Sequence, residues 1–549
     1  MPHQNADIKR LPTGRVNFSA IRKASMLYVD KTRYVSQIAE SWEPIFLARP
    51  RRFGKSLLVS TLESLFSKGL EDFHGLDIEK IWNDTTYKVV HLDFSRLAGK
   101  TGKDFTTALN DLLVFMFGSN NKIPVSEEQI KNLSPDTILY KIAEHLQDNS
   151  TVLLIDEYNA PLTRHMADKN TLNDLTQILA DFYATVKQYV DKFRHIFITG
   201  VTRIAHVSIF SAFNNLKDIS LEKDYAMLLG FTQEEIENNF ATHVENAAHV
   251  LGWSQENILT ALKDRYDGYR FSLDAPGTVY APWSVLNFFT NPALGFENYW
   301  FESGGTPSLL LNFIKMHKSF TLRESAKQKF STTLVDLKAK YEIPEIPPEI
   351  LFTQAGYLTL LPKSQTRADL VFPNTEVAES MLQLALSVEG MRISDDTSYD
   401  CDRLVEYIDT RNLDKIIDIF NRILVDCSSS KSVIFTDELS VRDLIFAAIP
   451  QTSALLKSKE RANALGISDL ELTTRHTHMV IEFKRTYPPK SPGDKGRDAE
   501  KSLALGIAQM ISRKYGMKFP DLPLYRLVMV IGTCERQLLP EFCREVREG

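Results

Sequence analysis

The segment Ile45-Phe-Leu-Ala-Arg-Pro-Arg-Arg-Phe-Gly-Lys-Ser56 decides the fold of the N-terminal part of the chain. The apolar stretch Pro44–Ala48 predicts a short strand, and leucines at helical spacing predict a helix over Ser56–Phe66. Gly54-Lys-Ser56 therefore stands between a strand and a helix, which is the context of a phosphate-binding loop. In such a loop, backbone N–H groups at the helix N-terminus bind phosphate, the lysine reaches the β- and γ-phosphate oxygens, and the serine hydroxyl joins the Mg²⁺ shell.

A second motif strengthens this interpretation. The full loop pattern has glycine at the position of Arg49, so Gly-Lys-Ser alone is a weak signal. Val152-Leu-Leu-Ile-Asp-Glu157 consists of four apolar residues followed by two carboxylates, and either it is a buried strand that merely ends in an acidic loop, or its acids act on nucleotide. In the second case Asp156 holds Mg²⁺ through water and Glu157 polarises the attacking water. The residues that we predict to bind the nucleotide are Arg52, Phe53, Gly54, Lys55, Ser56, Leu57, Asp156 and Thr199, with Ser56 and Asp156 at the metal.

Strands and helices alternate over the first 220 or so residues, which predicts a parallel sheet covered by helices. Further strands are expected at Val89–Phe94, Thr151–Ile155 and His195–Thr199. The order is that of P-loop ATPases that insert a strand between their two nucleotide motifs, and Thr199 would then sense the γ-phosphate. Three arginines lie near these motifs: Arg51, Arg52 and Arg203. They could contact phosphate or complete the site of a neighbouring copy. Alternatively, they could be ordinary arginines that are solvated or paired with acids.

The segment Gly466–Arg485 predicts a β-hairpin with its turn between Arg475 and His476. In the register that gives one apolar face, Leu470 opposes Ile481 and Leu472 opposes Met479, with Phe483 beside them. The other face then brings together Asp469, Glu482 and Lys484.

Two carboxylates and a lysine at one end of a hairpin fit metal-dependent phosphodiester hydrolysis. The carboxylates suit Mg²⁺ or Mn²⁺, and Lys484 could orient the attacking water or stabilise the developing charge. A solvent-facing glutamate–lysine ladder is the plain alternative. The surrounding pattern favours the site: a helix over Asp437–Ala448 carries Glu438, a helix over Ala499–Tyr515 carries Gln509, and a strand follows at Leu524–Gly532. The basic loop between Tyr487 and Arg497 is suited to phosphate contact, although any single lysine in it could simply be solvated.

These motifs resemble those of a bacterial family that joins an AAA-ATPase-like N-terminal domain to a C-terminal domain of the PD-(D/E)XK nuclease superfamily. The resemblance covers most of the chain and is carried by Tyr28-Val-Asp-Lys-Thr32, Arg49–Ser56, Leu154-Ile-Asp-Glu-Tyr158, Thr199-Gly-Val-Thr-Arg203, Tyr266-Asp-Gly-Tyr269, Tyr299-Trp-Phe-Glu302, Gly466-Ile-Ser-Asp469 and Ile481-Glu-Phe-Lys484. It implies that Arg49 is the family's own form of the loop. Asn159 stands where an aspartate is common in the family, which weakens any role for that position.

The resemblance also implies ligands and site residues. The nuclease residues that it indicates are Asp469, Glu482, Lys484, Gln509 and Glu438, with Asp469 and Glu482 as metal ligands. Glu460 and Asn463 lie on a further segment to which we assign no role. The implied cofactors are ATP and Mg²⁺, with Mn²⁺ as a possible substitute, and the expected partners are nucleotide, nucleic acid (DNA rather than RNA) and further copies of the chain.

The whole sequence is consistent with this multidomain organisation. Its 549 residues exceed one ordinary core, and 43% hydrophobic with 24% charged residues is the composition of a globular protein. We expect an α/β protein with an N-terminal P-loop parallel sheet of AAA (ASCE) type over 1–225, a mostly helical region over 226–430, and a restriction-endonuclease-like α/β domain over 431–549. The net charge of -6 excludes a general basic coat but allows a local basic groove.

The remaining signals concern compartment. Four cysteines without CxxC spacing indicate a reducing environment and favour neither disulfides nor zinc. The polar N-terminus lacks the apolar core of a signal peptide, and no apolar run approaches the roughly 20 residues that span a bilayer. A cytoplasmic protein that does not associate with membranes is the resulting expectation.

Three functions remain open on the sequence. The leading one is an ATP-binding, Mg²⁺-dependent nuclease, in which the ATPase domain regulates phosphodiester cleavage in defence or in processing of mobile elements. The second is an ATP-regulated scaffold or nucleic-acid-binding switch without nuclease activity. The third is a working nuclease beneath a domain that binds nucleotide without hydrolysing it; Arg49 favours this, and Glu157 opposes it.

Overall fold

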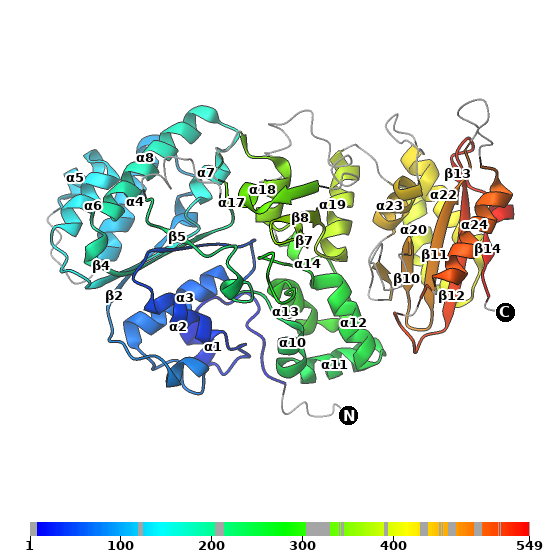
Figure 1. Cartoon of the computed structure of the whole chain (residues 1–549), viewed down its shortest axis with the longest axis horizontal. Coiled ribbons are helices and arrows are strands. Elements are labelled where there is room, and N and C mark those ends of the chain that lie inside the picture. Colours follow the sequence, from blue (N-terminus) through cyan, green and yellow to red (C-terminus); the bar gives the residue numbers. More distant parts are fainter. Residues whose placement is uncertain are drawn as a thin grey trace.

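The computed structural model describes residues 8–118, 125–203, 213–303, 330–339, 341, 345–388, 393–428, 438–449, 452, 454–458, 468–487, 497–513, 515–516 and 518–547. An N-terminal sheet with helices, a mainly helical middle region and a C-terminal sheet with helices follow one another along the long axis of the molecule (Figure 1). The mixed α/β architecture is as predicted.

The N-terminal sheet is parallel throughout. Its strands are β1 (Ile45–Ala48), β2 (Lys88–Asp93), β3 (Thr151–Asp156), β4 (Phe193–Gly200) and β5 (Lys217–Asp218). They lie in the order β2-β3-β4-β1-β5, so β4 separates the strand that precedes the phosphate loop from the strand that carries Asp156. This arrangement confirms the predicted parallel sheet and is that of a P-loop ATPase domain.

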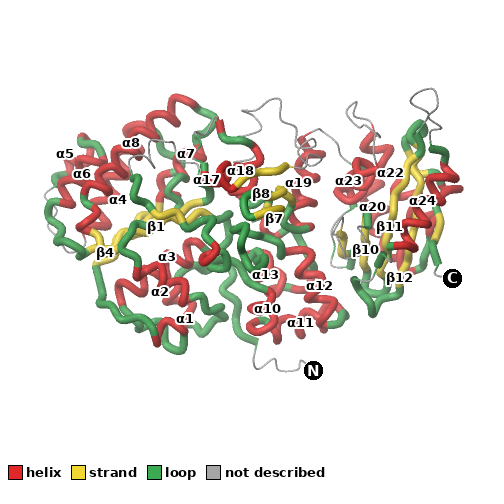
Figure 2. The backbone as a smooth tube through the Cα atoms, in the orientation of Figure 1, coloured by secondary structure: helices red, strands yellow, loops and turns green. Residues whose placement is uncertain are grey.

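Helices cover both faces of this sheet because the strand side chains alternate between two apolar clusters (Figure 2). On one face, Ile45 and Leu47 pack among the first three helices; on the other, Phe46 packs towards the remaining ones. The first group comprises α1 (Phe18–Lys23), α2 (Thr32–Glu40) and α3 (Lys55–Lys68). The second comprises α4 (Gly102–Gly118), α5 (Glu127–Asn132), α6 (Pro135–Ala143), α7 (Ala160–Arg164) and α8 (Lys169–Gln188).

The middle region is mainly helical, and at its start the Thr232 side chain caps α10 in a capping box with Glu235. Its described helices are α10 (Gln233–Asn239), α11 (Ala241–Leu251), α12 (Gln255–Tyr266), α13 (Pro282–Thr290), α14 (Tyr299–Glu302), α17 (Leu334–Lys338), α18 (Pro348–Ala355), α19 (Thr375–Val388), α20 (Asp395–Asp402), α21 (Leu404–Asp409) and α22 (Leu413–Ser428).

The middle region, expected to be mostly helical, also contains strands, two of which lie around the turn-rich segment 362–375. The strands form a three-stranded antiparallel sheet of β6 (Phe330–Thr333), β7 (Thr359–Ser364) and β8 (Arg367–Val371), in the order β6-β8-β7. Pro362 obscured the strand in the sequence, and it is tolerated because β7 lies at the edge of the sheet, where a missing N–H costs little.

The C-terminal sheet has the order β13-β12-β11-β10-β9, with β14 also paired to β12. Its strands are β9 (Leu456–Ser458), β10 (Leu470–Thr473), β11 (His478–Arg485), β12 (Leu524–Gly532), β13 (Gln537–Leu538) and β14 (Arg544–Glu545). The hairpin register is confirmed, with Leu470 opposite Ile481 and Leu472 opposite Met479. The predicted flanking helices are α23 (Glu438–Ala448) and α24 (Ala499–Ser512).

The two faces of this sheet are covered differently. The apolar face of the hairpin packs against α20, α21, α22 and α23 in one buried cluster. Figure 1 shows α20, α22 and α23 beside the strands of this sheet. On the opposite face, α24 packs through Met510 against Val480 and Val528. The apolar clusters cross both predicted domain boundaries, since Leu27 and Val29 lie in the core of α11–α13 and α20–α22 share a core with the C-terminal sheet.

Candidate functional site

The phosphate loop connects β1 to α3, and its backbone requires glycine at one position. Gly54 is the N-cap of α3 with φ +93°, in the left-handed region that residues with a side chain rarely adopt. The cap residue has no side chain to accept from the first N–H groups of the 14-residue helix. The N-terminus of α3 can therefore direct these donors, and its positive dipole end, to a phosphate.

Lys55 and Ser56 meet the two acids at the carboxyl end of β3, Asp156 and Glu157. The Lys55 ammonium lies 3.3 Å from Glu157 Oε1 and donates to the Pro50 carbonyl oxygen at 3.2 Å. The Ser56 hydroxyl donates to Asp156 Oδ2 at 2.6 Å. Burial and the neighbouring charge of Glu157 raise the pKa of Asp156, while the Ser56 hydrogen bond and Lys55 oppose that rise. The loop and the acidic end of β3 thus lie together in the structure.

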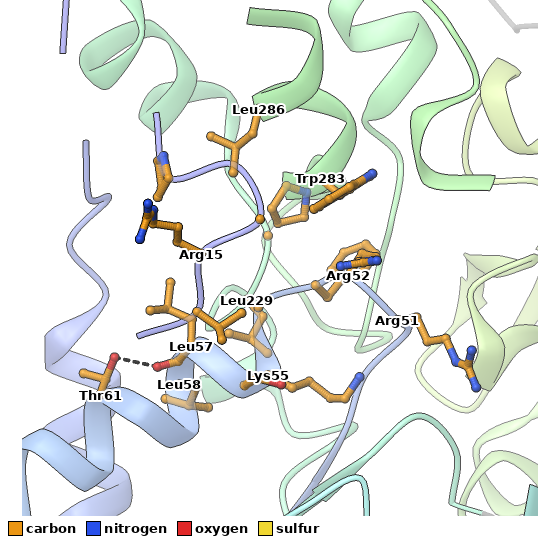
Figure 3. Close-up of a pocket in the computed structure, with 18 of the residues that line it drawn as sticks. Arg15, Arg51, Arg52, Lys55, Leu57, Leu58, Thr61, Leu229, Trp283 and Leu286 are labelled. Carbon is orange, nitrogen blue, oxygen red and sulfur yellow. Dashed lines mark hydrogen bonds between the residues drawn. The ribbon is translucent and has the colours of Figure 1, made fainter. Parts of the chain in front are cut away.

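A cavity of about 730 Å³ opens at this loop (Figure 3). The predicted residues that line it are Arg52, Phe53, Gly54, Lys55, Ser56, Leu57 and Glu157. Arg52 stacks on Trp283 of α13, with its guanidinium carbon 4.2 Å from the ring centroid. Leu229 and Leu286 add apolar surface to the wall. The volume, the donors of the loop and an apolar wall together fit a nucleotide, and the adjacent hydroxyl and carboxylate oxygens of Ser56 and Asp156 fit Mg²⁺.

Glu157 has an unusual backbone conformation. Its φ is +51°, in the left-handed region, which costs energy for a residue with a side chain. The conformation places the Glu157 side chain at the cavity, next to Lys55, directly after the buried strand ends.

Thr199 and Arg49, which the sequence also singled out, make hydrogen bonds within the protein. The Thr199 hydroxyl is fully buried and donates to the Leu47 carbonyl oxygen at 2.7 Å, so it faces β1. Arg49 is buried and donates to the carbonyl oxygens of Ala48, Ser220 and Tyr225 at 2.7–3.0 Å.

Arg203 and Asn159 also have structural partners. Arg203 forms an ion pair with Asp218, with nitrogen and oxygen 2.5 Å apart, which matches the acid-paired alternative. The Asn159 amide donates to the Thr202 hydroxyl at 2.6 Å and is buried. Arg51 lines the cavity, and its backbone carbonyl oxygen accepts from the Trp300 indole.

At the C-terminal hairpin, the structure brings Asp469, Glu482 and Lys484 to one end. Asp469 Oδ2 accepts from the Phe483 N–H at 2.7 Å, and the Lys484 ammonium contacts Glu482 Oε1. Glu482 is 1% exposed and Lys484 8%, so this is not a solvent-facing charge ladder. Because Glu482 and Lys484 are buried, each charge compensates the other. A metal cation bound at this end of the hairpin would meet the carboxylate oxygens of Asp469 and Glu482, which these contacts hold in place.

Helix α24 closes this face of the sheet. A Cβ on Gly506 would lie 2.4 Å from Val528 Cγ1 and 3.2 Å from Lys484 Cγ, so glycine permits the helix to pack directly on the lysine. Gln509 lies on the same helix, three residues further, and donates to the Tyr515 hydroxyl at 3.0 Å.

Several predicted positions lie wholly or partly outside the described residues. Glu438 is the first residue of α23, but its side chain is not described; Glu460, Asn463, Gly466 and the loop 488–496 are outside the described ranges. Within the described residues, no group of three His, Cys, Asp or Glu side chains is arranged to hold a metal ion. At the C-terminal hairpin, the two carboxylates that lie near Lys484 are those of Asp469 and Glu482.

Sequence reasoning missed the cavity residues that come from the middle region, above all Trp283. The only local signal was the apolar helix Pro282–Thr290, which reads as an ordinary core helix. No helix in the described ranges combines the length and the apolar character needed to cross a membrane.

Comparison with known proteins identifies the N-terminal part. A family described as predicted AAA-ATPase matches residues 12–210. An uncharacterized protein in the vnfD 5' region of Azotobacter chroococcum mcd 1 is 30% identical over 384 residues, which are 69% of this chain and 70% of that protein. A Walker-type ATPase of Pyrococcus abyssi aligns over 68% of this chain and 99% of its own, with 12% identity and a TM-score of 0.30. The chain belongs to the family of the Azotobacter protein, and its N-terminal part is an AAA-ATPase-like domain.

Proposed function

We propose that the chain is an ATP-binding, Mg²⁺-dependent nuclease in which the N-terminal ATPase domain regulates a PD-(D/E)XK-type site in the C-terminal domain. The three predicted domains, 1–225, 226–430 and 431–549, are part of this proposal. The proposed substrate is DNA, and the proposed setting is defence or the processing of mobile elements.

One observation carries the nuclease part: Asp469, Glu482 and Lys484 converge at one end of a buried hairpin. Glu482 and Lys484 are nearly enclosed by protein, and the loss of their hydration costs free energy. A hairpin that served only as a scaffold would not require two such buried charges. In the proposed reaction Asp469 and Glu482 would hold Mg²⁺, which would supply polarisation of the phosphodiester, and Lys484 would orient the attacking water. Gln509 and Glu438 are proposed supporting residues from the two flanking helices.

At the N-terminal site, ATP is held by the loop. Backbone N–H groups of residues 52–57 bind the phosphates, Lys55 compensates their charge, and Ser56 with Asp156 holds Mg²⁺. Glu157 is placed beside the Lys55 ammonium and would orient the water that attacks the γ-phosphate. Thr199 supports this site through β1, because its hydroxyl is bonded to the Leu47 carbonyl oxygen.

The test is cleavage by the purified full chain. Linear single- and double-stranded DNA and RNA are offered with Mg²⁺ or Mn²⁺, with and without ATP. Asp469→Ala and Lys484→Ala should abolish cleavage and leave ATP affinity unchanged. The matched controls are Asp418→Ala and Lys415→Ala, an exposed acid–base pair on α22 on the other side of the sheet, which should cleave as wild type. Undiminished cleavage by Asp469→Ala would refute the assigned site.

The second candidate is an ATP-regulated scaffold or nucleic-acid-binding switch. The contact between Lys484 and Glu482 favours it in one respect, since an ion pair can be purely structural. A wild-type chain that binds DNA with ATP-dependent affinity, but cuts no substrate with either metal, would establish this function.

A further inference from the structure

Helix α19 carries two fully buried glutamates, Glu376 and Glu379, that no proposed site uses. They lie three residues apart, almost one turn of the helix. A carboxylate is rarely enclosed completely unless its charge is compensated, so each must have specific partners. Glu376 has its partners in the middle region, whereas Glu379 also contacts a lysine of the C-terminal sheet.

Glu376 is linked to the phosphate loop. Its Oε1 accepts from the Trp300 backbone N–H at 2.6 Å, and its Oε2 accepts from the Ser284 hydroxyl at 2.8 Å. The Trp300 indole N–H then donates to the carbonyl oxygen of Arg51 at 2.9 Å. Arg51 belongs to the loop that wraps the cavity, so two consecutive hydrogen bonds join the loop backbone to α19.

The contact with the loop is also close in van der Waals terms. Gly356, which ends α18 with φ +93°, has no room for a side chain, since a Cβ there would lie 2.7 Å from Pro50 Cβ and 3.2 Å from Trp300 Cζ2. The loop is therefore held between the middle region and the ATPase sheet, and a change in its backbone position would displace Trp300.

Glu379 is linked to the C-terminal sheet. Its Oε2 lies 2.8 Å from Arg265 Nη1 of α12, and its Oε1 accepts from Lys457 Nζ at 2.7 Å. Lys457 belongs to β9 and also donates to the Phe446 carbonyl oxygen of α23 at 3.0 Å. In the sheet, Lys457 pairs with Leu472 of β10, the strand that directly follows Asp469.

All three charges of this ion cluster are 0% exposed, which decides how α19 and β9 can move. Separating either cation from Glu379 would leave an uncompensated charge in the interior, a costly state. The ion cluster therefore favours movement of α19, α12 and β9 together.

We propose that Trp300 and Glu376 are positioning residues of the phosphate loop, and that α19 with the Glu379–Lys457 ion pair links nucleotide occupancy of that loop to the C-terminal sheet. The inference rests on the proposed function in that it takes ATP as the ligand of the loop. Through this link, nucleotide binding shifts the positions of β9 and β10 and, through β10, the position of Asp469.

Two variants test the link at its two ends. Trp300→Phe removes the indole donor and keeps an aromatic ring; Trp82→Phe is its control, because Trp82 is a similarly buried indole in the N-terminal core, away from α19. Lys457→Met removes the buried cation and keeps the length of the side chain. The probe is a non-hydrolysable ATP analogue with Mg²⁺, and each full-length protein is first checked for cooperative unfolding.

Nucleotide affinity and hydrogen exchange are the readouts. In wild type, the analogue should change the exchange rate of amides in β9 and β10. Trp300→Phe should weaken analogue binding about fivefold, the worth of one hydrogen bond. Lys457→Met should bind the analogue within about twofold of wild type but lose the response in β9 and β10. Trp82→Phe should keep both properties.

The outcomes separate the link from the function on which it rests. Unchanged hydrogen exchange in β9 and β10 of wild type saturated with the analogue would overturn the link. So would Trp300→Phe if it bound the analogue with wild-type affinity and kept the wild-type exchange response in β9 and β10. If Lys457→Met does not fold, Trp300→Phe alone decides. If the analogue changes hydrogen exchange in β9 and β10 but the chain cuts no nucleic acid, the link is supported and the nuclease function is refuted. A wild-type chain that does not bind the analogue would overturn both the nucleotide site and the link.

Discussion

Replacing Glu376 with glutamine isolates the effect of one buried carboxyl on the pH dependence of stability. Burial is the largest influence and raises the pKa of Glu376 from its ordinary value of 4.5 to about 7, against the charge of Arg265 and the hydrogen bonds from Trp300 and Ser284. Glutamine resembles the protonated form, since its carbonyl oxygen can accept from the Trp300 N–H and its amide can donate to the Ser284 hydroxyl.

The sign and size follow from linkage. The folded chain holds the Glu376 proton more tightly than the unfolded chain, so this group's contribution is complete below pH 4.5 and is lost as pH rises to about 7. One pKa unit corresponds to about 1.4 kcal/mol, so the loss amounts to about 3 kcal/mol. Glu376→Gln should therefore be close to wild type at acidic pH and more stable than wild type, by up to about 3 kcal/mol, at pH 8.

The assay is urea unfolding of full-length wild type and Glu376→Gln at a series of pH values across this range. The difference between the two free energies of unfolding removes the titration of all other groups that do not sense Glu376. The groups that do sense it are Arg265, Tyr266, Tyr269 and Glu379. Glu256→Gln, an exposed glutamate of α12, should follow wild type at every pH. A pH-independent difference between Glu376→Gln and wild type would refute the reasoning.

Three further changes test the two sites and their scaffold. Lys55→Ala should weaken ATP binding at least about tenfold by titration calorimetry, because it removes the cation of the loop; unchanged affinity would contradict the phosphate-loop assignment. Gly506→Val should destabilise the C-terminal domain by about 1–3 kcal/mol in chemical unfolding and reduce cleavage without changing ATP affinity, since its Cβ alone would clash with Val528 and crowd Lys484. Arg49→Met should lower stability by about 1–3 kcal/mol, because three backbone carbonyl oxygens lose their donor, with a smaller effect on ATP affinity than Lys55→Ala; the reverse order would show that Arg49 binds phosphate.

The sequence by itself determined the local architecture of both sites. Gly54-Lys-Ser56 predicted the strand–loop–helix unit, because glycine at a helix start and an apolar strand before it are local requirements. The hairpin register also followed from the sequence, because only one pairing puts Leu470, Leu472 and Ile481 on one face.

The tertiary structure decided what each polar side chain touches. Arg203 and Thr199 looked available for phosphate in the sequence, but Arg203 pairs with Asp218 and Thr199 donates to the Leu47 carbonyl oxygen. The wall at Trp283 and the contact between Glu379 and Lys457 join residues far apart in the chain. Residue spacing encodes which face of one element a side chain occupies, whereas the partner on that face depends on how separate elements pack, and short-range periodicity carries no record of that.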